Sequence, residues 1–297
     1  MRYREFVKAL QGELESRLGE AAVTFQKVTK NNEVTKDCFL ISESGYDISP
    51  AVYIEEYYRE FRDGMSLKEA ADKIAEVYKE CRSGLSLDAG SFCEFEKVRS
   101  SVFCRLINRG KNRKLLQNVP YVPYLDLAVV FYYALENKTI GSGTVLIHSE
   151  HMQFWNITEQ TLWNQARENT RRCTPAKLYT MKDLLLEMVP EGENMDLRNE
   201  DVPMHVLTNE KRYQGACGIL YDPVLQEAAQ KLGSFYVLPS SVHECILVPE
   251  NASPQPEELM AMVHEINLTQ VPPEEVLSDH IYHYDAKKHH LTIYCPH

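Results

Sequence analysis

The sequence predicts an α+β fold, in which a helix-rich N-terminal module packs on a mixed, mainly antiparallel α+β body. Apolar residues recur at helical spacing behind capping residues in several segments. Short apolar runs in the second half of the chain come in pairs separated by turn residues, which is typical of antiparallel hairpins. Helices and strands do not alternate regularly, as they do in a doubly wound parallel sheet, and this order favours the α+β class.

The first 110 residues are predicted to be mostly helical, with one small hairpin. Helices are expected at residues 3–18, 54–61 and 66–81, and strands at 23–29 and 38–42. Ser66 and Glu69 form a capping box at the start of the third helix. Ser91 and Glu94 repeat this pattern, so a further helix is expected to carry the apolar residues as far as Leu106.

The rest of the chain is predicted to mix hairpins with capped helices. Strands are expected at 125–135, 144–148, 204–207, 218–221, 235–238, 245–248, 281–284 and 291–294, and helices after Thr158, after Thr180, at 222–232 and at 257–268. Pro120 and Pro123 predict a turn. Pro223 favours a first helical turn, and Gly233 is expected to end that helix. Residues 189–203 are predicted to form an acidic loop.

After the basic link Arg109–Lys114, the sequence changes from mostly helical patterns to paired strands mixed with helices. This change predicts a domain boundary near residue 115. Residues 1–114 are assigned to the helical module with its hairpin, and residues 115–297 to the α+β body. The two parts can also form one continuous domain.

Composition and charge disfavour some classes of function and indicate where in the cell the protein is located. The formal net charge of −11 disfavours broad electrostatic binding to nucleic acid, although the local basic strip Arg109–Lys114 keeps that option open. No stretch reaches the ~18–20 apolar residues that span a bilayer, and the start of the chain lacks a secretory pattern. The eight cysteines form no CxxC and predict reduced thiols. We therefore expect a cytoplasmic protein.

Familiar cofactor and metal motifs are absent from the sequence. It contains no GxGxxG, GxxxxGK[ST], HExxH, GxSxG or EF-hand loop, so no cofactor and no metal is predicted. Two His-x-x-His pairs occur, His148 with His151 and His280 with His283. Both are expected at strand ends or loops, where this spacing does not bring the imidazoles together on a metal.

The segment from Leu238 to Cys245 holds the most unusual group of polar residues. Ser240, Ser241, His243 and Glu244 place two hydroxyls, an imidazole and a carboxylate at the junction of two predicted strands. These are the groups that nucleophilic catalysis uses, provided that they converge in space. The alternative is architectural, because serines after a proline commonly form turns through hydrogen bonds to the backbone.

Two further acids complete the candidates. Asp279, next to His280, would supply the acid of a catalytic group if it packed beside the two serines. Asp126 interrupts an apolar run, and a buried carboxylate needs a partner. We expect that partner to be a basic group of the 109–114 link.

Several phrases resemble a family of uncharacterised proteins from gut-dwelling clostridia that carries a domain of unknown function. The residues that carry the resemblance are Lys114–Leu116, Leu125–Leu127, Trp155–Thr158, Leu207–Asn209, Leu238–Glu244 and Leu277–Tyr282. The C-terminal two thirds is more distantly similar to the YtpQ-like proteins of Firmicutes. The resemblance implies a cytoplasmic bacterial protein of α+β type, and it implies no reaction, cofactor or catalytic residue.

Two functional hypotheses follow. The first is a non-catalytic protein-interaction or regulatory module with a protein partner, favoured by the missing motifs and by clusters of tyrosine, a residue common in protein contacts. The second is a hydrolase-type enzyme that uses Ser240 or Ser241 with His243, Glu244 and Asp279. Contact with a membrane is not expected.

Overall fold

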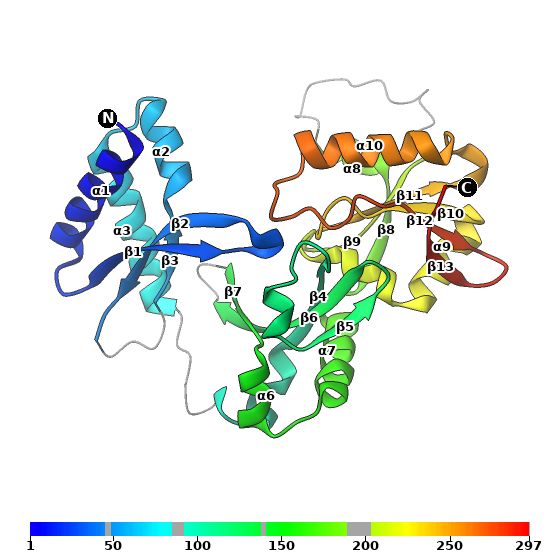
Figure 1. Cartoon of the computed structure of the whole chain (residues 1–297), viewed down its shortest axis with the longest axis horizontal. Coiled ribbons are helices and arrows are strands. Elements are labelled where there is room, and N and C mark those ends of the chain that lie inside the picture. The colour runs from blue at the N-terminus through cyan, green and yellow to red at the C-terminus, as the bar shows by residue number, and fades with distance from the viewer. Residues whose placement is uncertain (45–48, 85–91, 138–140, 189–202, 297) are drawn as a thin grey trace. The chain divides into compact units, whose positions relative to one another are not determined.

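The computed structural model describes residues 1–44, 49–84, 92–137, 141–188 and 203–296, and the chain folds as two compact units (Figure 1). Unit 1 consists of Met1–Ser101 and Tyr133–Val145, and unit 2 of Val102–Tyr132 and Leu146–His297. Helices combine with three mainly antiparallel sheets in the described residues, which confirms the α+β class. The domain boundary near residue 115 stays a prediction.

Unit 1 packs helices against a small antiparallel sheet. Its elements are α1 (Tyr3–Leu18), α2 (Ile54–Arg62), α3 (Leu67–Gly84), α5 (Phe95–Val98), the 3-10 segments η1 (Asn31–Glu33) and η2 (Arg99–Ser101), and the sheet β1 (Ala22–Thr29), β2 (Thr35–Ser42), β3 (Ala51–Tyr53). Phe6, Leu10 and Phe39 are fully buried in its core. The expected capping box is confirmed, since the Ser66 N–H donates to Glu69 Oε2 (2.7 Å) and the Glu69 N–H to Ser66 Oγ (3.2 Å).

The helix predicted to continue to Leu106 is wrong. The helix α5 ends at Val98, and the chain enters strand β4 (Val102–Asn108). This strand is at the edge of its sheet, and α7 (Glu159–Cys173) satisfies part of its backbone: Thr170 Oγ1 accepts the Cys104 N–H and the Asn169 amide donates to the Val102 carbonyl. The long-range partners override the local helical pattern. Ser91 lies outside the described residues.

The sheet that contains β4 draws its strands from both units. Its order is β4, β6 (Leu127–Asn137), β5 (Tyr121–Tyr124), with β7 (Gly141–Leu146) also paired to β6. Strands β4 and β5 belong to unit 2, β7 belongs to unit 1 except for Leu146, and β6 has residues in both units. The pairing of β6 with β7 confirms the predicted hairpin. The turn predicted at Pro120 and Pro123 is wrong, because β5 pairs with β6 there and Asp126 lies in the turn between them.

The second sheet of unit 2 has six antiparallel strands. Their order is β13 (His290–Ile293), β12 (Tyr282–Asp285), β10 (Phe235–Leu238), β11 (Cys245–Pro249), β9 (His205–Asn209), β8 (Ala176–Thr180). The predicted pairing of β10 with β11 and the C-terminal hairpin are confirmed. Figure 1 shows α10 (Pro256–Thr269) lying along this sheet, where Leu259 and Val263 pack against residues of β10 and β11.

The remaining elements of unit 2 are helical. They are α6 (Ser149–Trp155), α8 (Met181–Met188), α9 (Asp222–Leu232), η3 (Leu115–Gln117), η5 (Gly215–Leu220) and η6 (Glu250–Ala252). Helix α9 has the predicted bounds, with Pro223 in its first turn and Gly233 as its C-cap, and Thr158 and Thr180 cap the following helices as expected. The acidic segment predicted as a loop falls almost entirely on residues 189–202, outside the described residues.

The strand predicted at 218–221 is wrong, since η5 is a 3-10 helix. Its small residues allow close packing on the sheet, where a Cβ on Gly218 would lie 3.1 Å from the Ala176 Cβ. Among the described side chains, Cys38, Cys104, Cys217 and Cys245 are buried free thiols, and Cys93, Cys173 and Cys295 are exposed and free.

Candidate functional site

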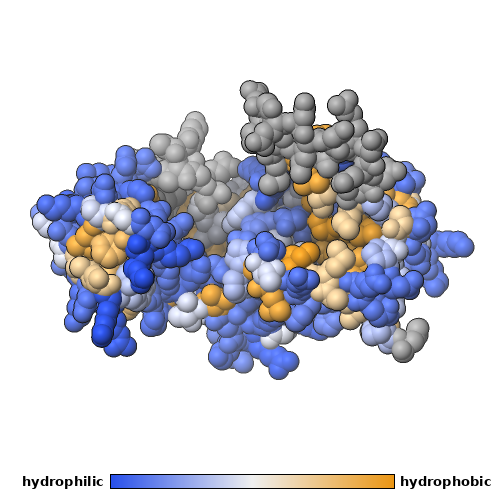
Figure 2. Space-filling model, turned by 90° about the horizontal axis from the view of Figure 1, so that it is seen from above, coloured by the Kyte–Doolittle hydropathy of each residue, from blue (hydrophilic) through white to orange (hydrophobic). Residues whose placement is uncertain are grey.

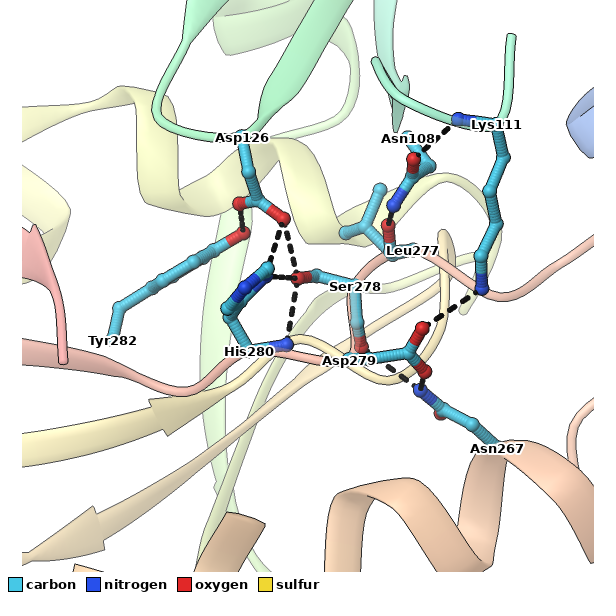
Figure 3. A network of polar contacts seen from close by, with 9 residues as sticks. All are labelled: Asn108, Lys111, Asp126, Asn267, Leu277, Ser278, Asp279, His280 and Tyr282. Atoms are coloured by element: carbon cyan, nitrogen blue, oxygen red, sulfur yellow. Dashed lines mark hydrogen bonds and ion pairs between the residues drawn. The ribbon is translucent and has the colours of Figure 1, made fainter. Parts of the chain in front are cut away.

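Asp126 is the centre of a polar cluster in unit 2. It lies in the turn between β5 and β6, where Leu125 adopts a left-handed conformation with φ of 54°. The Tyr282 hydroxyl donates to Asp126 Oδ1 (2.6 Å), the Ser278 hydroxyl to Oδ2 (2.6 Å), and His280 Nδ1 lies 3.1 Å from Oδ2 (Figure 3). One carboxylate therefore gathers three side chains of the segment before and within β12.

The members of this cluster differ in how much of each side chain is exposed to solvent. Tyr282 and Ser278 are fully buried, whereas the side chains of Asp126 and His280 are 18% and 54% exposed. Burial raises the pKa of Tyr282 well above its ordinary value, and the adjacent carboxylate raises it further. The phenol therefore stays protonated and donates its hydrogen bond throughout the physiological range.

A second arm of the cluster ties the same loop to the basic link. Lys111 Nζ lies 3.0 Å from Asp279 Oδ2, and the Asn267 amide of α10 donates to Asp279 Oδ1 (2.8 Å) and to the Ser278 carbonyl (2.9 Å). Burial alone would raise the pKa of Asp279, but the hydrogen bonds from Asn267 and Lys111 outweigh it and lower the pKa. Asp279 therefore connects its loop to the basic link and to α10 through its contacts with Lys111 and Asn267.

Asn108 completes the connection between the link and the loop. Its amide donates to the Leu277 carbonyl (2.9 Å), and its Oδ1 accepts the Lys111 N–H (2.8 Å). The expected side-chain pairing of Asp126 with the basic link is wrong, because the Asp126 carboxylate contacts Tyr282, Ser278 and His280. Lys111 of the link pairs with Asp279 instead. The link reaches Asp126 through its backbone, where the Arg109 N–H donates to the Asp126 carbonyl (3.2 Å).

The segment with the two serines lies beside this loop. The Leu277 N–H donates to the Ser240 carbonyl (3.0 Å) and the Val242 N–H to the Glu275 carbonyl (2.9 Å), so the two predicted polar segments run antiparallel. The sequence hypothesis required this proximity. The side chains, however, make separate sets of contacts, and Asp279 and His280 point to the partners described above (Figure 3).

His243 is held by groups other than the serines. Its Nδ1 accepts the Gln214 N–H (3.2 Å), and its Nε2 lies 3.5 Å from Glu275 Oε1. The lone pair of Nδ1 is therefore occupied, and the Nε2 proton faces a carboxylate. Ser241 Oγ accepts the His243 backbone N–H (3.0 Å), which is the turn geometry of the architectural alternative.

Ser240 and Glu244 complete the predicted group. Ser240 and Ser241 are buried, and Glu244 is half-buried. Burial raises the pKa of Glu244, an effect partly offset by His243 and by a hydrogen bond with Ser241. Among the described residues, the His243 imidazole contacts Gln214 and Glu275 and forms no hydrogen bond with either serine hydroxyl, so these four residues are neighbours without a proton-transfer chain.

Comparison with models of protein families shows which family the chain belongs to. A family model described as a family of unknown function, DUF5688, matches residues 3–286. The chain belongs to the DUF5688 family. No curated protein and no solved structure matches it.

An open pocket of about 530 Å³ adjoins Asp126 in this DUF5688 protein. It is lined by Arg109, Gly110, Arg113, Leu116, Gln117, Tyr121 and Asp126. These residues come from the basic link, η3 and the start of β5, and from the turn before β6. A volume of this size is in the range of small-molecule sites.

The structure places three of the four histidines of the His-x-x-His pairs at a loop or near a strand end, as expected: His148 precedes α6, His280 precedes β12, and His283 lies at the start of β12. The expectation is wrong for His151, which lies inside α6, where its Nδ1 accepts the His148 N–H (3.1 Å). Burial lowers the pKa of His151, and His148 lowers it further. In the second pair, His283 lies 3.6 Å from Glu250. The described residues contain no group of three or more His, Cys, Asp or Glu placed to hold a metal ion.

Sequence reasoning on this DUF5688 chain missed Ser278 and Tyr282 as partners of Asp126. A signal was present, because Ser278, His280 and Tyr282 are spaced by two residues and therefore share one face of an extended segment. Asn108 and Asn267 had no such signal. Finally, no described helix combines the length and the apolar character that crossing a bilayer requires.

Proposed function

We propose that the protein is a non-catalytic binding module whose binding site is the pocket beside Asp126. One observation carries this proposal: Arg109 and Arg113 line the pocket without an ion-pair partner among the described residues, while the adjacent Asp126 accepts hydrogen bonds from Tyr282 and Ser278. Unpaired guanidinium groups in a concave site are available to a ligand or to an acidic partner.

The surface supports recognition by polar groups. In the view of Figure 2, hydrophobic residues form separate groups within a mainly hydrophilic surface. Tyr282 and Tyr284, from one of the predicted tyrosine clusters, are buried, whereas Tyr121 is 36% exposed at the pocket. The two buried tyrosines are thus unavailable to a partner, and the exposed ring of Tyr121 supports an interaction or regulatory role that uses charged and aromatic side chains.

We also propose that the protein is bacterial and cytoplasmic. The YtpQ-like proteins of Firmicutes would be its distant relatives. The free buried thiols of Cys38, Cys104, Cys217 and Cys245 support a reducing compartment. The net charge of −11 is compatible with a protein that stays in solution and avoids nonspecific binding to nucleic acid.

A photoreactive side chain in the pocket tests this function. We replace Gln117 with p-benzoylphenylalanine in the full chain, irradiate cells that express it, and identify the adduct by mass spectrometry. One defined adduct is expected, and it should be lost when Arg109→Ala and Arg113→Ala are combined. The same photoreactive group at Glu227, exposed on α9, should not form it. An adduct that persists without the two arginines overturns the proposal.

Catalysis is a second candidate, favoured by one specific contact. His280 Nδ1 points to Asp126, so its Nε2 is left for a substrate or a water molecule on an imidazole that is 54% exposed. A carboxylate-oriented imidazole is a recognised general base. This arrangement replaces the predicted Ser241 and His243 pair as the strongest catalytic group. Turnover of a nitrophenyl ester or phosphate that His280→Ala abolishes, and that Ser241→Ala retains, would establish it.

A further inference from the structure

Hydrogen bonds within the protein hold the backbone around the basic pocket in place. Asn108 and Asn112 are buried, and the Asn112 amide donates to the Asn108 carbonyl (2.7 Å) within the link. The Asn112 carbonyl in turn accepts the Leu116 N–H (3.0 Å) at the start of η3. The backbone that carries Arg109 and Arg113 is therefore fixed by buried amides, which reduces the entropy lost on binding.

The charges of the link are not equivalent. Lys111 is neutralised by Asp279, whereas Arg109 and Arg113 face the pocket without a carboxylate partner among the described residues. The third charged residue of the wall is Asp126, whose oxygens accept hydrogen bonds from Tyr282 and Ser278. Two cations against one occupied carboxylate leave the pocket positive, in a chain whose net charge is −11.

The remaining wall is suited to a flat, partly polar group. Tyr121 offers an exposed ring, Leu116 an apolar side chain and Gln117 an amide that can donate and accept hydrogen bonds. Guanidinium groups match the oxygens of a phosphate in a two-bond geometry. A pocket with a cationic end and an aromatic wall thus fits an anionic ligand that also carries a ring.

We propose that the pocket binds a small phosphate monoester attached to a flat ring, with the phosphate on Arg109 and Arg113 and the ring against Tyr121. This inference rests on the proposed binding function and names its ligand class. The phosphate of a monoester carries nearly two charges at neutral pH, so two guanidinium groups can neutralise it. A nucleic-acid phosphate is a diester with one charge, and the acidic chain repels a polyanion at longer range.

Calorimetric titration of the full chain with adenosine 5′-monophosphate tests the proposal. Adenosine, which lacks the phosphate, is expected to bind at least tenfold more weakly. Arg109→Ala combined with Arg113→Ala should weaken adenosine 5′-monophosphate at least tenfold. The matched control combines Arg171→Ala with Arg172→Ala, two exposed arginines of α7 in the same unit. It removes the same charge and should leave the affinity unchanged.

Three outcomes would overturn the inference. The first is adenosine binding as tightly as adenosine 5′-monophosphate, and the second is an equal loss in the α7 control, which would indicate a general charge effect. The third is a twelve-nucleotide RNA that binds more tightly through the same arginines. If adenosine 5′-monophosphate and inorganic phosphate do not bind while the Gln117 adduct still depends on Arg109 and Arg113, the ligand class fails and the binding function stands. Circular dichroism verifies that each variant is folded.

Discussion

At the residue scale, the Asp126 carboxylate links groups that lie far apart in the sequence. Its three partners follow it by 152 to 156 residues. The sequence showed that Asp126 is an acid beside an apolar run and therefore needs a partner. The partner's identity depends on how two distant segments pack, which no local pattern contains, and so the sequence-based choice of the nearby basic link was wrong.

Tyr282→Phe tests how much this cluster stabilises unit 2. The change leaves Asp126 Oδ1 without its buried donor, so we expect a loss of about 1–3 kcal/mol in the free energy of unfolding. Urea denaturation measures it. Tyr294→Phe is the matched control, because its hydroxyl bonds the exposed Glu257 and its loss should cost less than about 0.5 kcal/mol. Equal losses would show that the Asp126 contact adds nothing.

Glu244 predicts a pH-dependent stability. Burial raises its pKa in the folded protein above the ordinary 4.5, so the folded state binds the proton more tightly than the unfolded state. The contribution of this group to stability is therefore fully present below pH 4.5 and is lost as the pH rises through the folded pKa. Glu244→Gln should stabilise the protein at pH 7.5 and give no advantage below pH 4.5.

Urea unfolding at pH 7.5 and pH 4 checks this prediction. Glu265→Gln, an exposed position on α10 without an ion-pair partner in the described part of the chain, serves as the control and should show no such difference. A gain from Glu244→Gln that is the same at both pH values would rule out burial of the charge as its cause.

At the element scale, sequence patterns predicted correctly the features that depend on residues close together in the chain. Capping residues such as Ser66, Thr158 and Thr180 marked helix starts, because a cap satisfies N–H groups within three residues of itself. Strand β4 escaped prediction because Val102, Phe103 and Leu106 fit both a helix face and a strand. Pairing with β6 and the side chains of α7 decide that choice, and they are distant in sequence.

Gly215 is predicted to be indispensable at the junction of β9, η5 and the segment before β11. A Cβ there would meet Thr208 Oγ1, the His243 carbonyl oxygen at 2.6 Å and the Asn209 nitrogen at 2.8 Å. Two of these are backbone atoms that cannot move independently. Gly215→Ala should therefore cost more than about 3 kcal/mol or prevent folding, as overpacking of a rigid site does.

Gly12→Ala makes the same chemical change at an open position. Nothing lies within 4 Å of its added Cβ, and Gly12 is inside α1. Alanine should stabilise the protein there by about 0.5–1 kcal/mol. Thermal unfolding compares the two variants, and a mild effect of Gly215→Ala would show that η5 can shift away from the sheet.

At the scale of the whole molecule, the fold class could be predicted from the sequence, and the domain boundary near residue 115 stays a prediction. Patterns of helices and hairpins predicted α+β correctly, because each is written in a short segment. Unit 1 includes Tyr133–Val145, a return of the chain that leaves no mark in the composition. A boundary drawn at residue 115 would also separate β4 from its partner β6.

Two fragments test this consequence. Residues 102–297 retain β4, and we expect them to unfold cooperatively in urea, followed by circular dichroism. Residues 115–297 lack β4, so Asn169 and Thr170 lose their backbone partners and the edge of β6 is uncovered. We expect this fragment to lose cooperative unfolding or to aggregate. Equal cooperativity of both fragments would support the boundary near residue 115.

The distance along the chain between Asp126 and its partners also has a consequence for synthesis on the ribosome. Ribosomes add about 5–20 residues per second, so the 152 residues between Asp126 and Ser278 take about 8–30 s to appear. During that interval the carboxylate stays hydrated, and the C-terminal strands that close the six-stranded sheet do not yet exist. The turn that carries Asp126 is thus synthesised early, and its three side-chain partners, Ser278, His280 and Tyr282, follow together much later.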